Sequence, residues 1–239
     1  MGKSIHYILQ EASYLEVFAL TFGYFVVLYF ILGPCFLWAC KQLEKKGLAN
    51  KIVSRKLPKN QLKTEIKHSF VSLIIFGLSG IPVIYLVRTG QIELLDNSFI
   101  NILFGVIFLN VFNELHFFVV HRMMHIPFML KYVHKVHHKS VVPTVYSVYS
   151  FHWIEALLLS TVPLCICPFI PFAPLAIGIY PLTSILLNYS GHCNYRFGNG
   201  KGMQSLIFGT KHNEHHSKGK QNFGFASGLM DRLYSLIKK

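Results

Sequence analysis

The sequence predicts an all-α integral membrane protein with about four transmembrane helices, the last pair a short hairpin, and a cytoplasmic helical cap that is rich in histidine. Of the 239 residues, 52% are hydrophobic and only 14% are charged, and the mean hydropathy is +0.43. Soluble domains carry about 25% charged residues, so this composition is typical of a membrane protein. The histidines group beside the apolar stretches, which predicts the cap.

Four apolar stretches are long enough to enter or cross a bilayer, which requires about 20 residues per helix. They cover residues 14–40, 68–87, 98–120 and 156–187. We expect Gly33-Pro34 to kink the first stretch, because proline removes a helical hydrogen bond. The last stretch contains five prolines. It is therefore predicted to form two short helices that turn near residues 168–174.

The segment 41–67 separates the first two stretches and carries nine lysines and arginines against two glutamates. Short loops that are rich in lysine and arginine stay in the cytoplasm, so this segment predicts the orientation of the chain. Residues 121–155 and 188–239 then fall on the same cytoplasmic face. We expect a multi-pass protein of the bacterial inner membrane or of the endoplasmic reticulum.

The net charge is +13, yet the basic residues lie beside apolar spans and not across a soluble fold. This arrangement argues against nucleic acid as a partner and favours contact with the membrane. Five cysteines, an odd number with no CxxC pair, predict neither a disulfide framework nor a zinc ribbon.

The histidines form one HxxxH pair and two HxxHH clusters, and two more stand alone between the clusters. Residues three or four apart share one face of a helix, so each cluster can direct its imidazoles at one point. Two metal ions with four to six nitrogen ligands each would use about eight to twelve side chains. The ten candidate ligands are His121, His125, His134, His137, His138, His152, His192, His212, His215 and His216.

The setting of these histidines favours iron. Nitrogen ligands suit iron, copper and zinc alike. A site beside membrane helices can receive lipids, however, and cleaving their unactivated C–H bonds requires O2 and a redox metal. Zinc has no redox chemistry, although it could replace iron in purified protein.

Polar residues near the clusters are candidates to orient the ligand imidazoles or to assist catalysis. We expect Glu114 and Asp231 in this role before Glu155 and Glu214, and we add Asn194, which follows His192 closely. A lipid tunnel could be lined by aromatic residues near the clusters. These are Phe117, Phe118, Phe128, Tyr146, Tyr149 and Phe151.

The motifs together resemble the fatty acid hydroxylase superfamily, also called the sterol desaturase family, and in particular its sterol C5-desaturase branch. The resemblance covers about residues 60–239, and residues 1–67 are expected to precede a hydroxylase-like catalytic domain at 68–239. The matching stretches are NQLKTEIKHS at 60–69, HRMMH at 121–125, HKVHH at 134–138, PTVYSVYSFHWIE at 143–155, GHCNYRF at 191–197, TKHNEHH at 210–216, NFG at 222–224 and MDRLYSL at 230–236.

The resemblance implies a di-iron oxygenase that hydroxylates or desaturates a sterol or fatty-acyl lipid with O2. Electrons would come from a separate carrier, of cytochrome b5 type or a ferredoxin with its reductase, since the chain contains no heme-binding HPGG stretch. The chain departs from the family pattern at three positions. Met230 replaces a tryptophan, Trp153 replaces a proline, and Asn188 stands where some hydroxylases carry another histidine.

Three other functions are compatible with parts of the pattern: a metal transporter, a metal-dependent lipid hydrolase, and a non-catalytic metal- or lipid-binding membrane protein. Transporter sites lie near the bilayer midplane, whereas these clusters lie outside the predicted spans. A hydrolase would use zinc and no O2. A non-catalytic relative would be expected to lose a cluster histidine, and all three clusters are complete.

Overall fold

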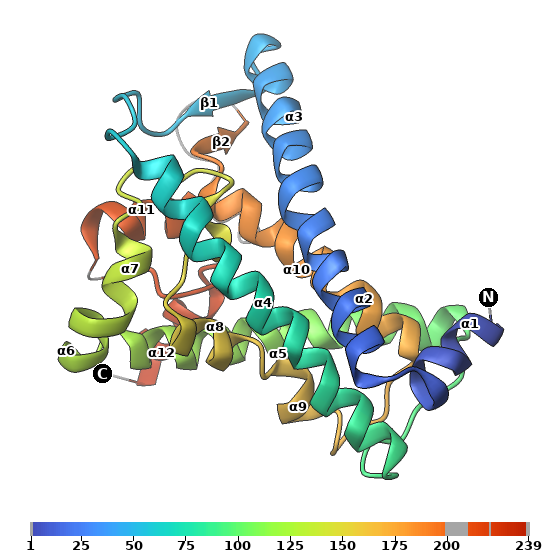
Figure 1. The fold of residues 1–239 in the computed structure, drawn as a ribbon. Coiled ribbons are helices and arrows are strands. Elements are labelled where there is room, and N and C mark those ends of the chain that lie inside the picture. The colour runs from blue at the N-terminus through green and yellow to red at the C-terminus, as the bar shows by residue number, and fades with distance from the viewer. Residues whose placement is uncertain (1, 199–209, 220, 238–239) are drawn as a thin grey trace.

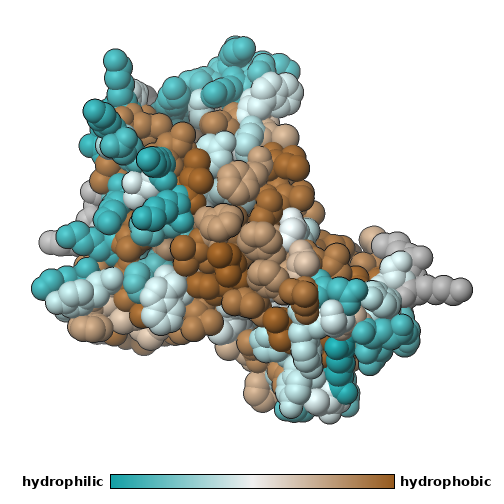
Figure 2. All heavy atoms as spheres, viewed as in Figure 1, coloured by the Kyte–Doolittle hydropathy of each residue, from teal (hydrophilic) through white to brown (hydrophobic). Residues whose placement is uncertain are grey.

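The computed structural model describes residues 2–198, 210–219 and 221–237, and these residues are mostly helical (Figure 1). Three of its helices are long and apolar enough to cross a membrane, spanning Tyr14–Lys45, Gln61–Arg88 and Phe99–Met124. In Figure 2 the hydrophobic surface covers the middle of the bundle, and hydrophilic side chains gather toward its ends. The predicted class, a helical membrane protein, is confirmed.

The first long helix combines α2 (Tyr14–Val27), a π-helical turn η2 (Leu28–Leu32) and α3 (Gly33–Lys45). It begins at a capping box in which Ser13 accepts from the Glu16 N–H at 3.2 Å and Glu16 accepts from the Ser13 N–H at 2.7 Å. Pro34 lacks the N–H that would continue the hydrogen-bond ladder. The π turn lies directly before it, so the helix changes its winding at the expected kink without ending there.

Helix α4 (Gln61–Arg88) begins seven residues earlier than the predicted second span. Its first turns are polar in sequence but buried in the structure. The Gln61 amide donates to the Val142 carbonyl at 2.7 Å, and the Thr144 hydroxyl donates to the buried Glu65 carboxylate at 2.6 Å. These hydrogen bonds fasten the start of α4 to the segment that follows the second histidine cluster.

The predicted hairpin consists of α8 (Trp153–Leu159), α9 (Val162–Ile166) and α10 (Pro174–His192). Its turn lies between α9 and α10, close to the predicted position. Helices α8 and α9 have 7 and 5 residues, which is too short for a span. Helix α10 packs along α5 (Phe99–Met124). A fourth transmembrane span therefore remains a prediction.

Two short strands, which the all-α class did not predict, tie the basic loop to the end of α10. Strand β1 (Ala49–Lys51) pairs antiparallel with β2 (Tyr195–Phe197). Next to the pair, Asn194 adopts a φ of 61° and its side chain hydrogen-bonds both the N–H and the carbonyl of Val53 at 2.9 Å. The basic loop thus lies on the side of the molecule that carries the histidines.

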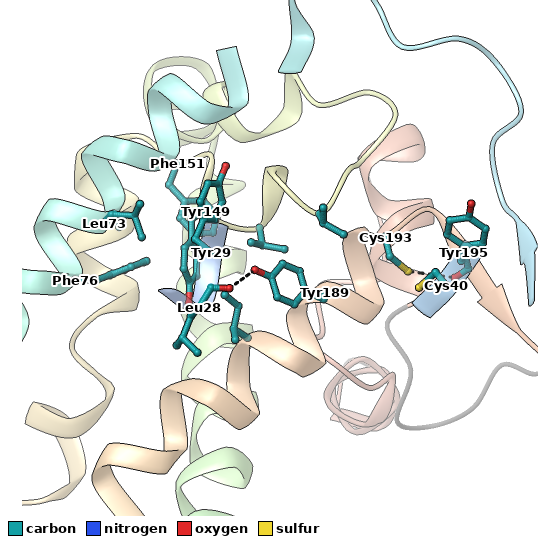
Figure 3. Packing of buried hydrophobic residues seen from close by; sticks show 14 of the residues in the cluster. Leu28, Tyr29, Cys40, Leu73, Phe76, Tyr149, Phe151, Tyr189, Cys193 and Tyr195 are labelled. Carbon is teal, nitrogen blue, oxygen red and sulfur yellow. Dashed lines mark hydrogen bonds between the residues drawn. The ribbon is translucent and has the colours of Figure 1, made fainter. Parts of the chain in front are cut away.

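The largest core cluster joins the first helix to α4, to α10 and to the segment before α8 (Figure 3). The Tyr189 hydroxyl donates to the Leu28 carbonyl at 2.7 Å, and the Tyr29 hydroxyl donates to the Tyr146 carbonyl at 2.8 Å. The Tyr149 ring packs edge-on against Phe76, with ring centroids 4.8 Å apart. Buried tyrosines are stable here because each packed ring has an apolar body and the hydroxyls of two of them find an acceptor.

The remaining elements are short, and α6, α7, α11 and α12 gather at one end of α5, away from α1 (Figure 1). They are α1 (Gly2–His6), η1 (Tyr7–Glu11), α6 (Pro127–Met129), η3 (Leu130–His134), α7 (Lys135–His138), η4 (Ser147–Tyr149), α11 (Thr210–Lys218) and α12 (Leu229–Ile237).

Candidate metal centre

Nine of the ten candidate ligands converge in two groups at this end of α5. In each group, one nitrogen from every imidazole lies within 4.8 Å of the others. The group of five consists of His121, His125, His134, His138 and His215. The group of four consists of His137, His192, His212 and His216.

Helical spacing explains how four separate segments supply the two groups. His121 lies in the last turn of α5 and His125 caps it. Within η3 and α7, successive histidines alternate between the groups, so one short helical segment contributes to both. The C-terminal residue of α10 and the three histidines of α11 complete the arrangement.

The distances between nitrogens fit shared metal ions. In the group of five, His215 Nε2 lies 3.0 Å from His125 Nε2 and 3.2 Å from His138 Nε2. In the group of four, His192 Nε2 lies 3.4 Å from His137 Nε2 and 3.2 Å from His216 Nε2. Two nitrogens bound to one metal at about 2.1 Å, at angles of about 90° to 109°, lie about 3.0 to 3.4 Å apart.

Hydrogen bonds at Nδ1 leave the opposite nitrogen of several rings free for a metal. The Nδ1 of His121 donates to the Phe223 carbonyl at 2.9 Å, and that of His215 donates to the Gln221 carbonyl at 2.7 Å. Because a carbonyl oxygen can only accept, Nδ1 must carry the proton and Nε2 presents its lone pair. His192 is held in the same way by the carbonyl one turn earlier in α10, at 3.0 Å.

His134 and Glu155 form a buried pair in which Nδ1 lies 2.8 Å from the carboxylate. Burial raises the pKa of Glu155 and lowers the pKa of His134. The Nε2 of His134 and the second carboxylate oxygen have no hydrogen-bond partner among the described residues. A cation at the free Nε2 would favour a charged carboxylate behind the ring, an arrangement common for metal-bound histidine.

The partly buried histidines are also kept neutral. Burial lowers the pKa of His125 to about 3 and that of His138 to about 4, and the neighbouring His215 contributes to both shifts. A metal ligand must be unprotonated, so both rings are in the binding form at neutral pH. The buried nitrogens and neutral rings together fit a pair of transition-metal ions.

Among the described residues, the hydrogen bonds of Glu114 and Asp231 go to one loop and not to an imidazole. The Glu114 carboxylate accepts from the N–H groups of Phe225, Ala226 and Ser227 at 3.2, 3.0 and 3.4 Å. Asp231 accepts from the N–H groups of Phe223 and Gly224 at 3.0 and 2.9 Å. Both carboxylates therefore position the loop whose Phe223 carbonyl orients a ligand.

The other two expected site residues hydrogen-bond to the backbone, and their roles at the site remain predictions. Asn194 bonds the backbone of Val53, as described above. His152 is absent from both groups of described residues, and its Nδ1 accepts from the Ile154 N–H at 3.3 Å as the N-cap of α8. Its assignment as a ligand remains a prediction.

Two kinds of site residue carried little sequence signal. Glu155 follows His152 by three residues in sequence, but in the structure it pairs with His134, which is 21 residues away. The orienting carbonyls of Asn188, Gln221 and Phe223 are backbone atoms, so residue identity does not mark them.

A cavity of about 400 Å³ lies between α2, α4, α5 and α10, and its lining is largely apolar. At the end nearest the histidines, the Phe151 ring lies 4.8 Å from the His137 ring, and the Phe117 ring lies 5.0 Å from the His121 ring. With Tyr149, these are three of the six aromatics expected to line a tunnel. Phe118 instead packs against Tyr234, 6.0 Å between ring centroids.

The chain belongs to the fatty acid hydroxylase family. The family model described as Fatty acid hydroxylase matches residues 106–235, more than half of the chain. This range contains all nine grouped histidines together with Glu114, Glu155 and Asp231. The resemblance inferred from the motifs is therefore confirmed.

The curated relatives belong to the sterol desaturase branch. The chain is 36% identical over 108 residues to the Delta(7)-sterol 5(6)-desaturase ERG3B of Gibberella zeae, covering 43% of this chain and 33% of the relative. It is 27% identical over 189 residues to lathosterol oxidase of Rattus norvegicus, covering 75% and 62%. It is 25% identical over 242 residues to erg3A of Aspergillus fumigatus, covering 95% and 63%.

The chain thus spans from about a third to somewhat under two thirds of the length of these relatives. No solved structure matches the chain.

Proposed function

We propose that the chain is a membrane-bound oxidoreductase that desaturates or hydroxylates a sterol-type lipid with O2, two iron ions and externally supplied electrons. The observation that carries the proposal is the convergence of nine buried or half-buried imidazoles beside an apolar cavity. The relatives named as sterol desaturases and lathosterol oxidase support a sterol as the substrate.

Iron bound by the two groups would supply O2 reduction and the removal of hydrogen from an unactivated C–H bond. The protein contributes position and environment. The carbonyls of Asn188, Gln221 and Phe223 fix the tautomers of their histidines, and Glu155 fixes that of His134. Aromatic rings at the cavity end exclude water from the reacting carbon, which limits side reactions.

We also propose that the histidine end faces the cytoplasm. The basic segment 41–67 lies on this side, since Arg55 donates to the Val141 carbonyl at 2.9 Å and β1 pairs with β2 beside α10. The excess of lysine and arginine favours retention of this segment in the cytoplasm. A separate cytoplasmic electron carrier could then reach the metal centre.

Comparative lipid mass spectrometry tests the proposed reaction. The intact protein and His137→Ala are expressed in a sterol-producing host with a reductase. We expect a sterol that has lost two hydrogens or gained one oxygen only with the intact protein. An unchanged sterol profile with folded, iron-loaded protein would contradict the proposal.

A further inference from the structure

Four polar side chains lie together on one wall of the cavity. Asn113 from α5 and Tyr180, Ser184 and Asn188 from α10 line it. The last three are spaced by four residues, and the next position in the series is His192. A helix rises about 1.5 Å per residue, so Asn188 lies about 6 Å and Ser184 about 12 Å before this ligand along α10. The polar wall therefore leads into the group of four.

These side chains keep unused hydrogen-bonding capacity. The Tyr180 hydroxyl donates to Asn113 Oδ1 at 2.9 Å, and Asn113 Nδ2 lies 3.4 Å from the Ser184 hydroxyl. Asn188 Nδ2 donates to the Val148 carbonyl at 3.2 Å. Among the described residues, Asn188 Oδ1 and the second Asn113 N–H have no partner. The Ser184 hydroxyl accepts from Asn113 and also hydrogen-bonds the Tyr180 hydroxyl, so its oxygen keeps one free lone pair.

Three other hydroxyls of the cavity donate within their own helices. Thr21 donates to the Val17 carbonyl at 2.8 Å, and Ser79 donates to the Phe76 carbonyl at 2.7 Å. Ser160 likewise donates to the carbonyl three residues before it, at 2.7 Å. The Tyr24 hydroxyl also donates to a backbone carbonyl, that of Gly178 at 2.9 Å. Among the described lining residues, the unpaired polar groups therefore lie on the wall between α5 and α10 and at the Tyr149 hydroxyl.

The lining also restricts the charge of a ligand. No Asp, Glu, Lys, Arg or His is among the described residues that line the cavity. A carboxylate or phosphate enclosed there would have no counter-charge, and an unpaired buried charge is strongly unfavourable. An uncharged hydroxyl, which both donates and accepts one or two hydrogen bonds, matches the free amide and hydroxyl groups.

We propose that Asn188, with Ser184 and Asn113, binds the single hydroxyl of a sterol and places the ring carbons nearest that hydroxyl beside the group of four. This inference rests on the proposed function, since it assumes a sterol substrate. The apolar body of the sterol fills the remainder of the cavity toward α1. Oxidation then occurs at the hydroxyl-bearing end of the ring system and not at the tail. Asn188, which departs from the family pattern in sequence, becomes a specificity-determining residue.

Binding to purified, metal-loaded protein tests the proposal without turnover. The probes are radiolabelled lathosterol and its 3-deoxy analogue in detergent micelles. We expect the wild type to bind lathosterol about five- to tenfold more tightly than the analogue, the effect of one or two hydrogen bonds. Asn188→Leu should bring the two affinities within about twofold by weakening lathosterol alone. Ser79→Ala, which alters a satisfied hydroxyl of the same cavity, should keep the wild-type preference.

Equal binding of both probes by the wild type would overturn the proposal, as would an unchanged preference in both Asn188→Leu and Ser184→Ala. Metal content reports whether each variant folds, and Ser184→Ala supplies the test if Asn188→Leu does not. Failure of the proposed function looks different. The wild type would then prefer lathosterol but leave it unoxidised when loaded with iron and given O2 and a reductase.

Discussion

The two histidine groups differ in the number of rings, in their burial and in how firmly the protein holds them. In the group of five, three rings donate Nδ1–H to fixed acceptors, and His125 and His138 are partly exposed. In the group of four every ring is buried, but among the described residues only His192 has such an acceptor. Both groups contact the cavity, the group of four through Phe151 and the group of five through Phe117.

This difference predicts different roles for the two metal ions. Five protein nitrogens nearly fill the coordination sphere of a first-row metal, whereas four leave room for an external ligand. Catalytic metal sites keep such an open position. We therefore expect the metal in the group of four to meet O2 and substrate, and the other metal to be held mainly by the protein.

The largest expected effect comes from removing one ligand from each group in turn. His134→Ala and His216→Ala should each lower the metal content from two ions per chain to about one. Both should reduce sterol oxidation by more than about 100-fold, beyond the loss typical of an outer partner. Elemental analysis and product mass spectrometry measure these effects, with the exposed His6→Ala as control. Loss of both metals in either variant would show that the groups are not separate sites.

Glu155→Gln should affect only the group of five. The amide cannot replace the charge behind His134, and loss of such partners lowers metal affinity about 10- to 100-fold. Competition with a chelator measures the affinity of each metal. Glu93→Gln, at an exposed loop position, is the matched control. Equal weakening of both metals would contradict the proposed pairing.

The metal-free protein should lose stability in acid. The folded-state pKa of His138 is lowered from 6.5 to about 4. Between these values the unfolded chain binds more protons than the folded chain, so stability increases with pH across this window. The melting temperature of chelator-treated protein should fall as the pH is lowered from 6.5 to 4. His138→Gln should flatten this dependence, and an unaltered slope would show that His138 does not cause it.

The smallest effect is expected at His152, which lies outside both groups. His152→Asn retains a side chain that can cap α8, so stability should change by less than about 1 kcal/mol. Two metals per chain should remain by elemental analysis. Loss of a metal in this variant would restore His152 as a ligand and enlarge one group.

The sequence predicted the parts of the site that depend on local spacing. The clusters at His121, His134 and His212 follow helical periodicity, so their shared faces could be read from the chain. The division of the histidines into two groups could not be predicted from the sequence, because it depends on how α5, α7, α10 and α11 pack. The strand pair β1–β2 was missed for the same reason, since three residues of a basic loop pair with a segment far along the chain.

The hairpin shows which features of a membrane segment the sequence does not predict. Its apolar composition predicted two short helices that enter or cross the bilayer, and its prolines predicted the turn. In the structure the first of these is divided into α8 and α9, with a break near Ser160 and Thr161. Composition does not distinguish a short helix packed on other helices from a span.

The metal content of the wild-type protein tests the central claim most directly. Protein purified from iron-supplied cells is examined by elemental analysis and by Mössbauer spectroscopy. We predict two iron ions per chain, each with a nitrogen-rich environment, and two distinguishable sites. A single metal ion per chain, or two zinc ions that iron cannot replace, would contradict the assignment of the histidine groups to a di-iron centre.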